Sequence, residues 1–355
     1  EEQLGCSVKE RINSNALSDG DWLLEMYRIL DELNHPFCPE NKLDREFLGF
    51  MEYVWKNSQD QLFEVMKEHL IRLKTSSENT YHGFVQYFSR FPLWGSFDPE
   101  NGDWQTLELR AKVLKQRSYE FLWLYKRLED ALSKRTLFAI LKNWAVLDIS
   151  DITAVKSIFP DYYEPDIFPT NKGDIFVDVG AFNGDSIQSY VSMYGDHYQK
   201  IYAFEISEDS VVELKKNTTD YHDVTVIQKG VGAQKSVMYL STNSSSSSAN
   251  RAESEENGDL KTEIEIVSID EELEDTPTFI KMDIEGAEQG ALLGCQKTIV
   301  QSHPKLAICT YHGYEDIWKV PFMIDCMYPK YKFYMRHYGG NLIPTEFVLL
   351  CKADE

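Results

Sequence analysis

The sequence predicts an α/β fold in two parts, an all-α region in residues 1–150 and an α/β domain in residues 151–355. In the first part, apolar residues recur every three or four positions, which is the spacing of one helix face. In the second part, short β-branched runs alternate with helical segments. Strands that alternate with helices are typical of a mostly parallel sheet covered on both faces.

The N-terminal part contains three clear helical stretches, in residues 22–33, 62–73 and 121–128. The aromatic residues between Tyr81 and Trp94 follow the same spacing, so we interpret them as core rather than as a ligand platform. We expect this region to mediate homodimer formation or acceptor recognition.

Seven strand-like runs follow the Pro- and Asp-rich bridge at residues 159–174. The last two runs are close enough in sequence to form an antiparallel hairpin at one edge of the sheet. In chain order, the runs are DIFVDVG, KIYAFEI, VTVIQKGV, TFIKMDIE, KLAICTYH, YKFYMRHY and EFVLLCK.

A polar insertion at residues 241–262 separates two further strand segments, SVMYLST and EIEIVSI. The insertion is rich in Ser and Glu and carries too few apolar side chains to pack against anything. We therefore predict a disordered surface loop there.

Composition excludes several classes of function. The formal net charge of -22 would repel a nucleic-acid backbone, so we expect no nucleic-acid partner. No apolar run is long enough to span a bilayer, and the first residues show no signal-peptide pattern. The six cysteines contain no C-x-x-C pair and are interpreted as reduced thiols, which predicts a cytoplasmic protein.

The stretch FVDVGAFNGDS, residues 176–186, joins the first predicted strand to a helix. Gly180 and Gly184 allow close approach of a ligand or a positive φ, and Ser186 is placed to cap a helix over residues 187–194. A dinucleotide loop needs a glycine where this chain has Phe182, so that the backbone can approach the phosphates. A pyrophosphate is therefore a poor fit.

Acidic residues around this loop point to a different cofactor. Asp178 and Asp185 would repel a phosphate but would favour the sulfonium and ammonium groups of S-adenosylmethionine. Glu205 ends the second strand, where a carboxylate can bind ribose hydroxyls of either cofactor. The loop therefore favours S-adenosylmethionine, with an NAD(P)-dependent oxidoreductase as the alternative.

Two later strands also end in polar groups. Asp283 and Glu285 lie two residues apart, so on a strand they would face the same side as a general base, a cation ligand or a substrate clamp. Glu288 fits the start of the next helix. His312 follows the fifth strand and has a pKa suited to accepting a hydroxyl proton. The sixth strand offers an acceptor-binding or salt-bridging pair, Arg336 and His337.

Together, VDVGAFNGDS, YAFEIS, FIKMDIEGAE, CTYHGYEDIW and YKFYMRHY resemble the FkbM family of methyltransferases over about residues 162–352. The resemblance implies a class I methyltransferase fold, with a seven-stranded sheet whose last strand is antiparallel. It also implies methyl transfer from S-adenosylmethionine to a hydroxyl, typically of a sugar, glycan or small metabolite. The donor-binding residues would be Asp178, Val179, Gly180, Ala181, Gly184, Asp185, Ser186, Glu205, Ile206 and Asp283.

The resulting hypothesis is in-line methyl transfer in which Asp283 or His312 accepts the proton of the acceptor. A metal-assisted variant would use Asp283 and Glu285 with a third oxygen ligand on Mg²⁺, and it is not favoured. A non-catalytic nucleoside-binding or scaffold protein is the remaining alternative.

Overall fold

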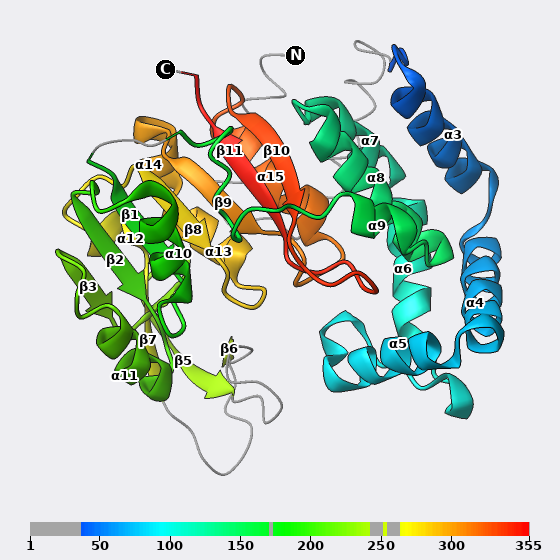
Figure 1. Ribbon diagram of the computed structural model, residues 1–355, viewed down its shortest axis with the longest axis horizontal. Helices are drawn as coiled ribbons and strands as arrows, with labels where there is room; N and C mark the ends of the chain where they lie inside the picture. The colour runs from blue at the N-terminus through cyan, green and yellow to red at the C-terminus, as the bar shows by residue number, and fades with distance from the viewer. Residues whose placement is uncertain (1–36, 170–172, 242–250, 254–262, 355) are drawn as a thin grey trace.

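The computed structural model describes residues 37–169, 173–241, 251–253 and 263–354. The predicted helix at residues 22–33 lies outside this range. Figure 1 shows the helical part on the right beside the α/β part on the left, which contains the strands of the main sheet.

The helical part begins with amphipathic helices whose ends are marked by the sequence. Helix α4 starts with a capping box in which Ser58 and Gln61 satisfy each other's backbone N–H groups. Helix α3 buries Phe47, Met51 and Val54 on one face. The helices are α3 (Lys42–Lys56), α4 (Gln59–Ser76), α5 (Glu78–Arg90), α6 (Gln105–Gln116), α7 (Ser118–Arg127), α8 (Ala131–Val146) and α9 (Ser150–Ala154), with 3-10 turns at Pro92–Trp94 and Pro99–Asn101.

The seven predicted strands form one seven-stranded sheet, which confirms the predicted fold class. Its order is β10-β11-β9-β8-β1-β2-β3, and β11 runs antiparallel to both of its neighbours. All five residues of β1 are buried, as expected for a strand covered on both faces. The strands are β1 (Ile175–Val179), β2 (Lys200–Phe204), β3 (Val224–Ile227), β8 (Phe279–Met282), β9 (Lys305–Cys309), β10 (Lys332–His337) and β11 (Phe347–Lys352).

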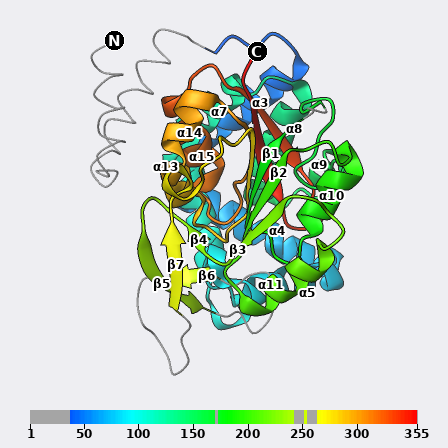
Figure 2. The ribbon, with the colours of Figure 1, turned by 90° about the vertical axis from the view of Figure 1, so that its left-hand side faces the viewer.

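Helices connect these strands and lie on the two faces of the sheet (Figure 2). Helix α15 continues through Pro321, and most of its side chains are buried. The connecting helices are α10 (Asp185–Tyr194), α11 (Glu208–Asn217), α12 (Ile269–Glu272), α13 (Glu288–Gly294), α14 (Gln296–Ser302) and α15 (Asp316–Met327).

A second, four-stranded sheet was not predicted as such. It contains β4 (Gly230–Val231), β5 (Ser236–Ser241), β6 (Arg251–Glu253) and β7 (Glu263–Val267), in the order β4-β7-β5-β6. The run VTVIQKGV is therefore split between the two sheets. Most of the predicted loop at residues 241–262 lies outside the described residues, but residues 251–253 pair with β5 as a strand.

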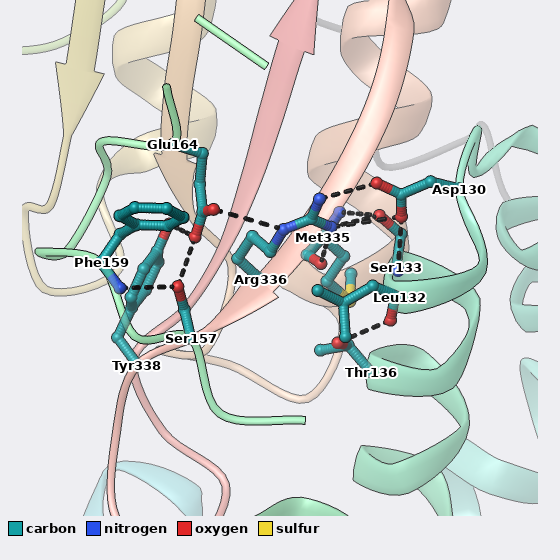
Figure 3. Close-up of polar contacts among 10 residues, drawn as sticks. All are labelled: Asp130, Leu132, Ser133, Thr136, Ser157, Phe159, Glu164, Met335, Arg336 and Tyr338. Carbon is teal, nitrogen blue, oxygen red and sulfur yellow. Dashed lines mark hydrogen bonds and ion pairs between the residues drawn. The ribbon is translucent and has the colours of Figure 1, made fainter. Parts of the chain in front are cut away.

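The helical part is joined to the main sheet by a buried polar cluster as well as by apolar packing. Arg336 of β10 is 1% exposed, and its guanidinium lies 2.6 Å from Asp130 Oδ2 and 2.8 Å from Ser133 Oγ. On the other side, its Nε lies 3.8 Å from Glu164 of the bridge (Figure 3). Asp130 also caps α8 by accepting the Ser133 N–H. One buried core runs through both parts, and the predicted boundary near residue 150 stays a prediction.

None of the described helices is long and apolar enough to cross a membrane.

Candidate active site

A cavity of about 620 Å³ lies at the carboxyl ends of β1, β2 and β8. Ligands of open α/β sheets bind at this edge, and the volume is in the usual range for a cofactor site. The bridge, the small sheet and the residue before β11 complete the wall. Its lining includes Asp161, Tyr162, Val179, Gly180, Phe182, Asp185, Ser186, Glu205, Ile206, Val231, Met238, Ile266, Lys281, Asp283, Glu285, Tyr311 and Glu346.

The loop after β1 is held against its neighbours on both sides. Gly180 has φ +80°, and a Cβ atom there would lie 1.9 Å from the carbonyl oxygen of Asp283. The N–H groups of Gly180 and Ala181 both donate to the carbonyl of Phe204, at 3.0 and 2.9 Å. Phe182 also has a positive φ, of 45°. The loop is therefore tightly folded, and the glycine at 180 serves close approach of the chain after β8.

The predicted capping role of Ser186 is wrong. The helix begins at Asp185 with Gly184 as its N-cap, so Ser186 lies inside the first turn. Its hydroxyl instead donates a short hydrogen bond to Asp178. Strand β1 places the buried carboxylate of Asp178 close to the first turn of α10, where it accepts the hydrogen bond from the Ser186 hydroxyl.

Asp178 is fully buried in an ion pair that the sequence reasoning missed. Lys281 Nζ lies 3.0 Å from Asp178 Oδ1 and donates to the Gly180 carbonyl at 2.7 Å. Burial lowers the pKa of Lys281, but Asp178 and Asp283 outweigh that effect and raise it, so the lysine stays charged. A lysine within the apolar run FIKM was the available signal, because a buried lysine needs a partner.

Glu205 follows β2 and lines the cavity with its neighbour Ile206. Its Oε2 accepts the Phe182 N–H at 2.9 Å, and its Oε1 accepts the Ser207 N–H at 2.8 Å. Burial raises the pKa of Glu205 above its ordinary value. The carboxylate is thus fixed at the tip of the strand and oriented by the glycine loop.

Asp283 and Glu285 do not share the face of a strand, so that prediction is wrong. Strand β8 ends at Met282, and Glu285 has a left-handed φ of 56°, because the chain turns there toward α13. The turn nevertheless brings both carboxylates to the cavity wall. Both also face the same ring, since His312 Nε2 lies 3.4 Å from Asp283 Oδ1 and 3.7 Å from Glu285 Oε2.

His312 is surrounded by carboxylates and does not line the cavity. Its side chain is 1% exposed, and Nδ1 lies 2.9 Å from Glu288 Oε1 in addition to the two contacts of Nε2. Burial lowers the pKa of His312, but Glu288, Asp283 and Glu285 raise it to about 10. A ring that is already protonated cannot accept a proton, so this arrangement opposes the predicted role of His312 as general base. The sequence could not show that three carboxylates converge on one ring.

Among the described residues, Asp283, Glu288 and His312 form a group whose donor atoms lie within 4.8 Å of one another. This group differs from the predicted magnesium ligands, because Glu288 takes the place of Glu285. The protonated His312 already supplies a cation to these carboxylates. Magnesium binding stays an untested alternative.

Two tyrosines outside the predicted set hold Asp283. The Tyr162 hydroxyl donates to Asp283 Oδ2 at 2.7 Å, and the Tyr311 hydroxyl donates to Oδ1 at 3.4 Å. The helical part supports this arrangement, because the Trp94 indole N–H donates to the carbonyl of Tyr311 at 2.7 Å. Tyr162 comes from the bridge, which the sequence analysis treated only as a connection between regions.

The structure thus separates the predicted residues into two groups. Val179, Gly180, Asp185, Ser186, Glu205, Ile206 and Asp283 line the cavity, whereas Asp178, Ala181, Gly184 and His312 lie behind its wall. The pair Arg336 and His337 does not reach the cavity. Arg336 joins Asp130 and Glu164, and His337 Nδ1 lies 2.9 Å from the carbonyl of Thr345.

The fold and the cavity at its carboxyl edge are those of a Rossmann-like methyltransferase. Residues 178–339 match the family model described as the methyltransferase FkbM domain, so this part of the chain is similar to the FkbM family. The family implies methyl transfer that depends on S-adenosylmethionine.

Solved structures with a similar fold include a methyltransferase FkbM from Methylobacillus flagellatus KT, with 21% identity and a TM-score of 0.57 over 77% of this chain and 71% of that chain. A putative rRNA methylase from Clostridium thermocellum has 16% identity and a TM-score of 0.34, over 52% and 90% of the two chains. A putative methyltransferase from Streptococcus mutans in complex with SAH has 14% identity and a TM-score of 0.32, over 52% and 90%. The latter two scores are too low to establish a shared fold. The chain matches no curated protein.

Proposed function

We propose that the protein transfers the methyl group of S-adenosylmethionine to a hydroxyl of a sugar, glycan or small metabolite. The observation that carries this proposal is one cavity with an end whose residues suit a nucleoside and an end that is rich in carboxylate and phenol groups. Glu205 and the glycine loop form the first end, and Asp283, Tyr162 and Tyr311 form the second.

The residues of the first end fit the cofactor. Gly180 has no room for a side chain, so the loop packs directly on the chain after β8. Glu205 offers carboxylate oxygens to ribose hydroxyls, and Ile206, Val231 and Ile266 provide an apolar wall for a base. The acids of the wall suit a cationic donor better than a pyrophosphate. When bound, S-adenosylmethionine supplies an electrophilic methyl group on a sulfonium sulfur.

At the second end, the chain binds and orients the acceptor. A carboxylate accepts hydrogen bonds from hydroxyl groups, and a phenol hydroxyl can both accept and donate them. A sugar is recognised through such hydrogen bonds to its hydroxyl groups. Asp283 is held by Tyr162 and Tyr311, so its position is preorganised rather than adaptable. Most of the rate acceleration should come from the alignment of donor and acceptor, since in-line displacement needs near-attack geometry.

The test uses S-adenosylmethionine with a deuterated methyl group and small-molecule extract as the source of acceptor. Labelled products are hydrolysed, and the labelled fragments are identified by mass spectrometry. The proposal predicts an oxygen-bound methyl group that is absent without enzyme. Label found only on nitrogen or carbon would contradict hydroxyl methylation.

A further inference from the structure

The reversed last strand carries an acidic residue to the cavity. Because β11 runs antiparallel to β9, the residues before β11 lie at the same edge as the carboxyl ends of the parallel strands. Glu346 is the residue directly before β11, and it lines the cavity. Its backbone has φ 51° and accepts the Tyr338 N–H at 2.9 Å, so its position is fixed.

The contacts or positions of the other acidic residues that line the cavity make them less suited to accept a proton from the acceptor. Asp283 Oδ2 accepts a hydrogen bond from the Tyr162 hydroxyl, and Asp283 Oδ1 faces Tyr311 and His312. Glu285 faces the charged ring of His312. Asp185 and Glu205 belong to the donor end, and Asp161 is exposed to solvent. Among the described acids that line the cavity, Glu346 remains at the acceptor end, and its carboxyl group shares the Tyr311 hydroxyl with Asp283.

We propose that Glu346 accepts the proton of the acceptor hydroxyl during methyl transfer, an inference that rests on the proposed function. In the balanced step, the acceptor oxygen forms a bond to the methyl carbon while the bond from that carbon to sulfur breaks. The sulfur keeps the bonding electron pair and becomes neutral. The hydroxyl proton passes to a carboxylate oxygen of Glu346, which becomes a neutral carboxylic acid and later loses the proton to water.

The electrostatics at this position suit a general base. Burial, and next the charge of Asp283, raise the pKa of Glu346 to about 8, whereas a hydrogen bond from Tyr311 and the charge of His312 act in the opposite direction. A base works best when its pKa lies near the working pH. By contrast, His312 and Lys281 lower the pKa of Asp283 despite its burial, and this makes Asp283 a weaker base. The titratable groups that influence Glu346 or are influenced by it are Tyr87, Asp161, Tyr162, Asp283, Cys309, Tyr311 and His312.

The first test measures the titration of Glu346 without any acceptor. Protein carrying carbon-13 at the glutamate carboxyl carbons is titrated by NMR, and Glu346→Gln identifies the resonance by its disappearance. Glu271→Gln, at an exposed position on α12, is the matched control and should remove a different resonance while leaving the Glu346 resonance in place. We expect the Glu346 midpoint near pH 8. A midpoint at the ordinary glutamate value of about 4.3 would overturn the proposal.

The second test measures initial rates of labelled methyl transfer to the extract at saturating donor. Glu346→Gln should reduce the rate about 10²- to 10⁴-fold with unchanged donor affinity, and Glu346→Asp should recover part of the loss. The wild-type rate should rise about tenfold per pH unit below the midpoint and level off above it. A Glu346→Gln rate within twofold of wild type would refute the role of Glu346. If the wild-type protein does not bind the donor, the proposed function itself is refuted.

Discussion

Replacing Gly180 by alanine should damage both stability and donor binding, and Gly102 provides a matched control. The two glycines have almost the same φ, +80° and +81°. A Cβ at Gly180 would lie 1.9 Å from the Asp283 carbonyl oxygen, whereas a Cβ at Gly102 would meet nothing within 4 Å. The pair therefore separates the cost of backbone conformation from the cost of the clash.

The expected magnitudes follow from these two contributions. A left-handed alanine costs roughly 1–2 kcal/mol, which should be the whole effect of Gly102→Ala. Overpacking adds about 1–3 kcal/mol, so Gly180→Ala should reduce the free energy of unfolding by about 2–5 kcal/mol. The displaced glycine loop, which forms part of the donor end, should also bind the donor about tenfold or more weakly, since a loss of roughly 1.4 kcal/mol is tenfold in Kd.

Urea unfolding and calorimetric titration with S-adenosylmethionine measure the two effects on the same preparations. If Gly180→Ala and Gly102→Ala lose equal stability and both keep wild-type donor affinity, the close approach at Gly180 has no role in forming the site.

Three further changes test other parts of the account. His312→Gln should cost about 3–5 kcal/mol of unfolding free energy because it leaves buried carboxylates without a cation. The pKa of His312 rises from 6.5 to about 10 on folding, so the difference in unfolding free energy between wild type and His312→Gln should be fully present below pH 6.5 and fade as pH rises through 10. A pH-independent difference in urea unfolding would contradict the charged ring. Trp94→Phe should cost about 1–3 kcal/mol and slow methyl transfer without changing donor Kd, because it removes the donor to the Tyr311 carbonyl; unchanged turnover would argue against support from the helical part. Glu205→Gln should weaken donor binding about tenfold or more by calorimetry, and wild-type affinity would exclude Glu205 from the donor site.

The strands could be predicted because their signal is local. Each run such as DIFVDVG is apolar, short and bounded by turn residues, and the alternation with helices defines a parallel sheet. Glu205 and Asp283 could be placed near the cavity by the same reasoning, because polar groups after parallel strands share one edge. The sequence pattern at these positions and the tertiary structure agree.

The remaining parts of the site depend on long-range contacts. Lys281 pairs with Asp178 across adjacent strands, and Tyr162 reaches Asp283 from a connecting segment. The charge of His312 depends on its contact with Glu288 and on the turn at Glu285, which has a left-handed backbone. The periodic pattern of the sequence predicts neither of these features. An acid directly before an antiparallel last strand is the one signal that could have drawn attention to Glu346.

The most direct test of the central claim is calorimetric titration of the full chain with S-adenosylmethionine, with NADH as the comparison ligand. We expect saturable binding of one S-adenosylmethionine per chain and no binding of NADH. Binding of NADH without binding of S-adenosylmethionine would contradict the assignment of the cavity.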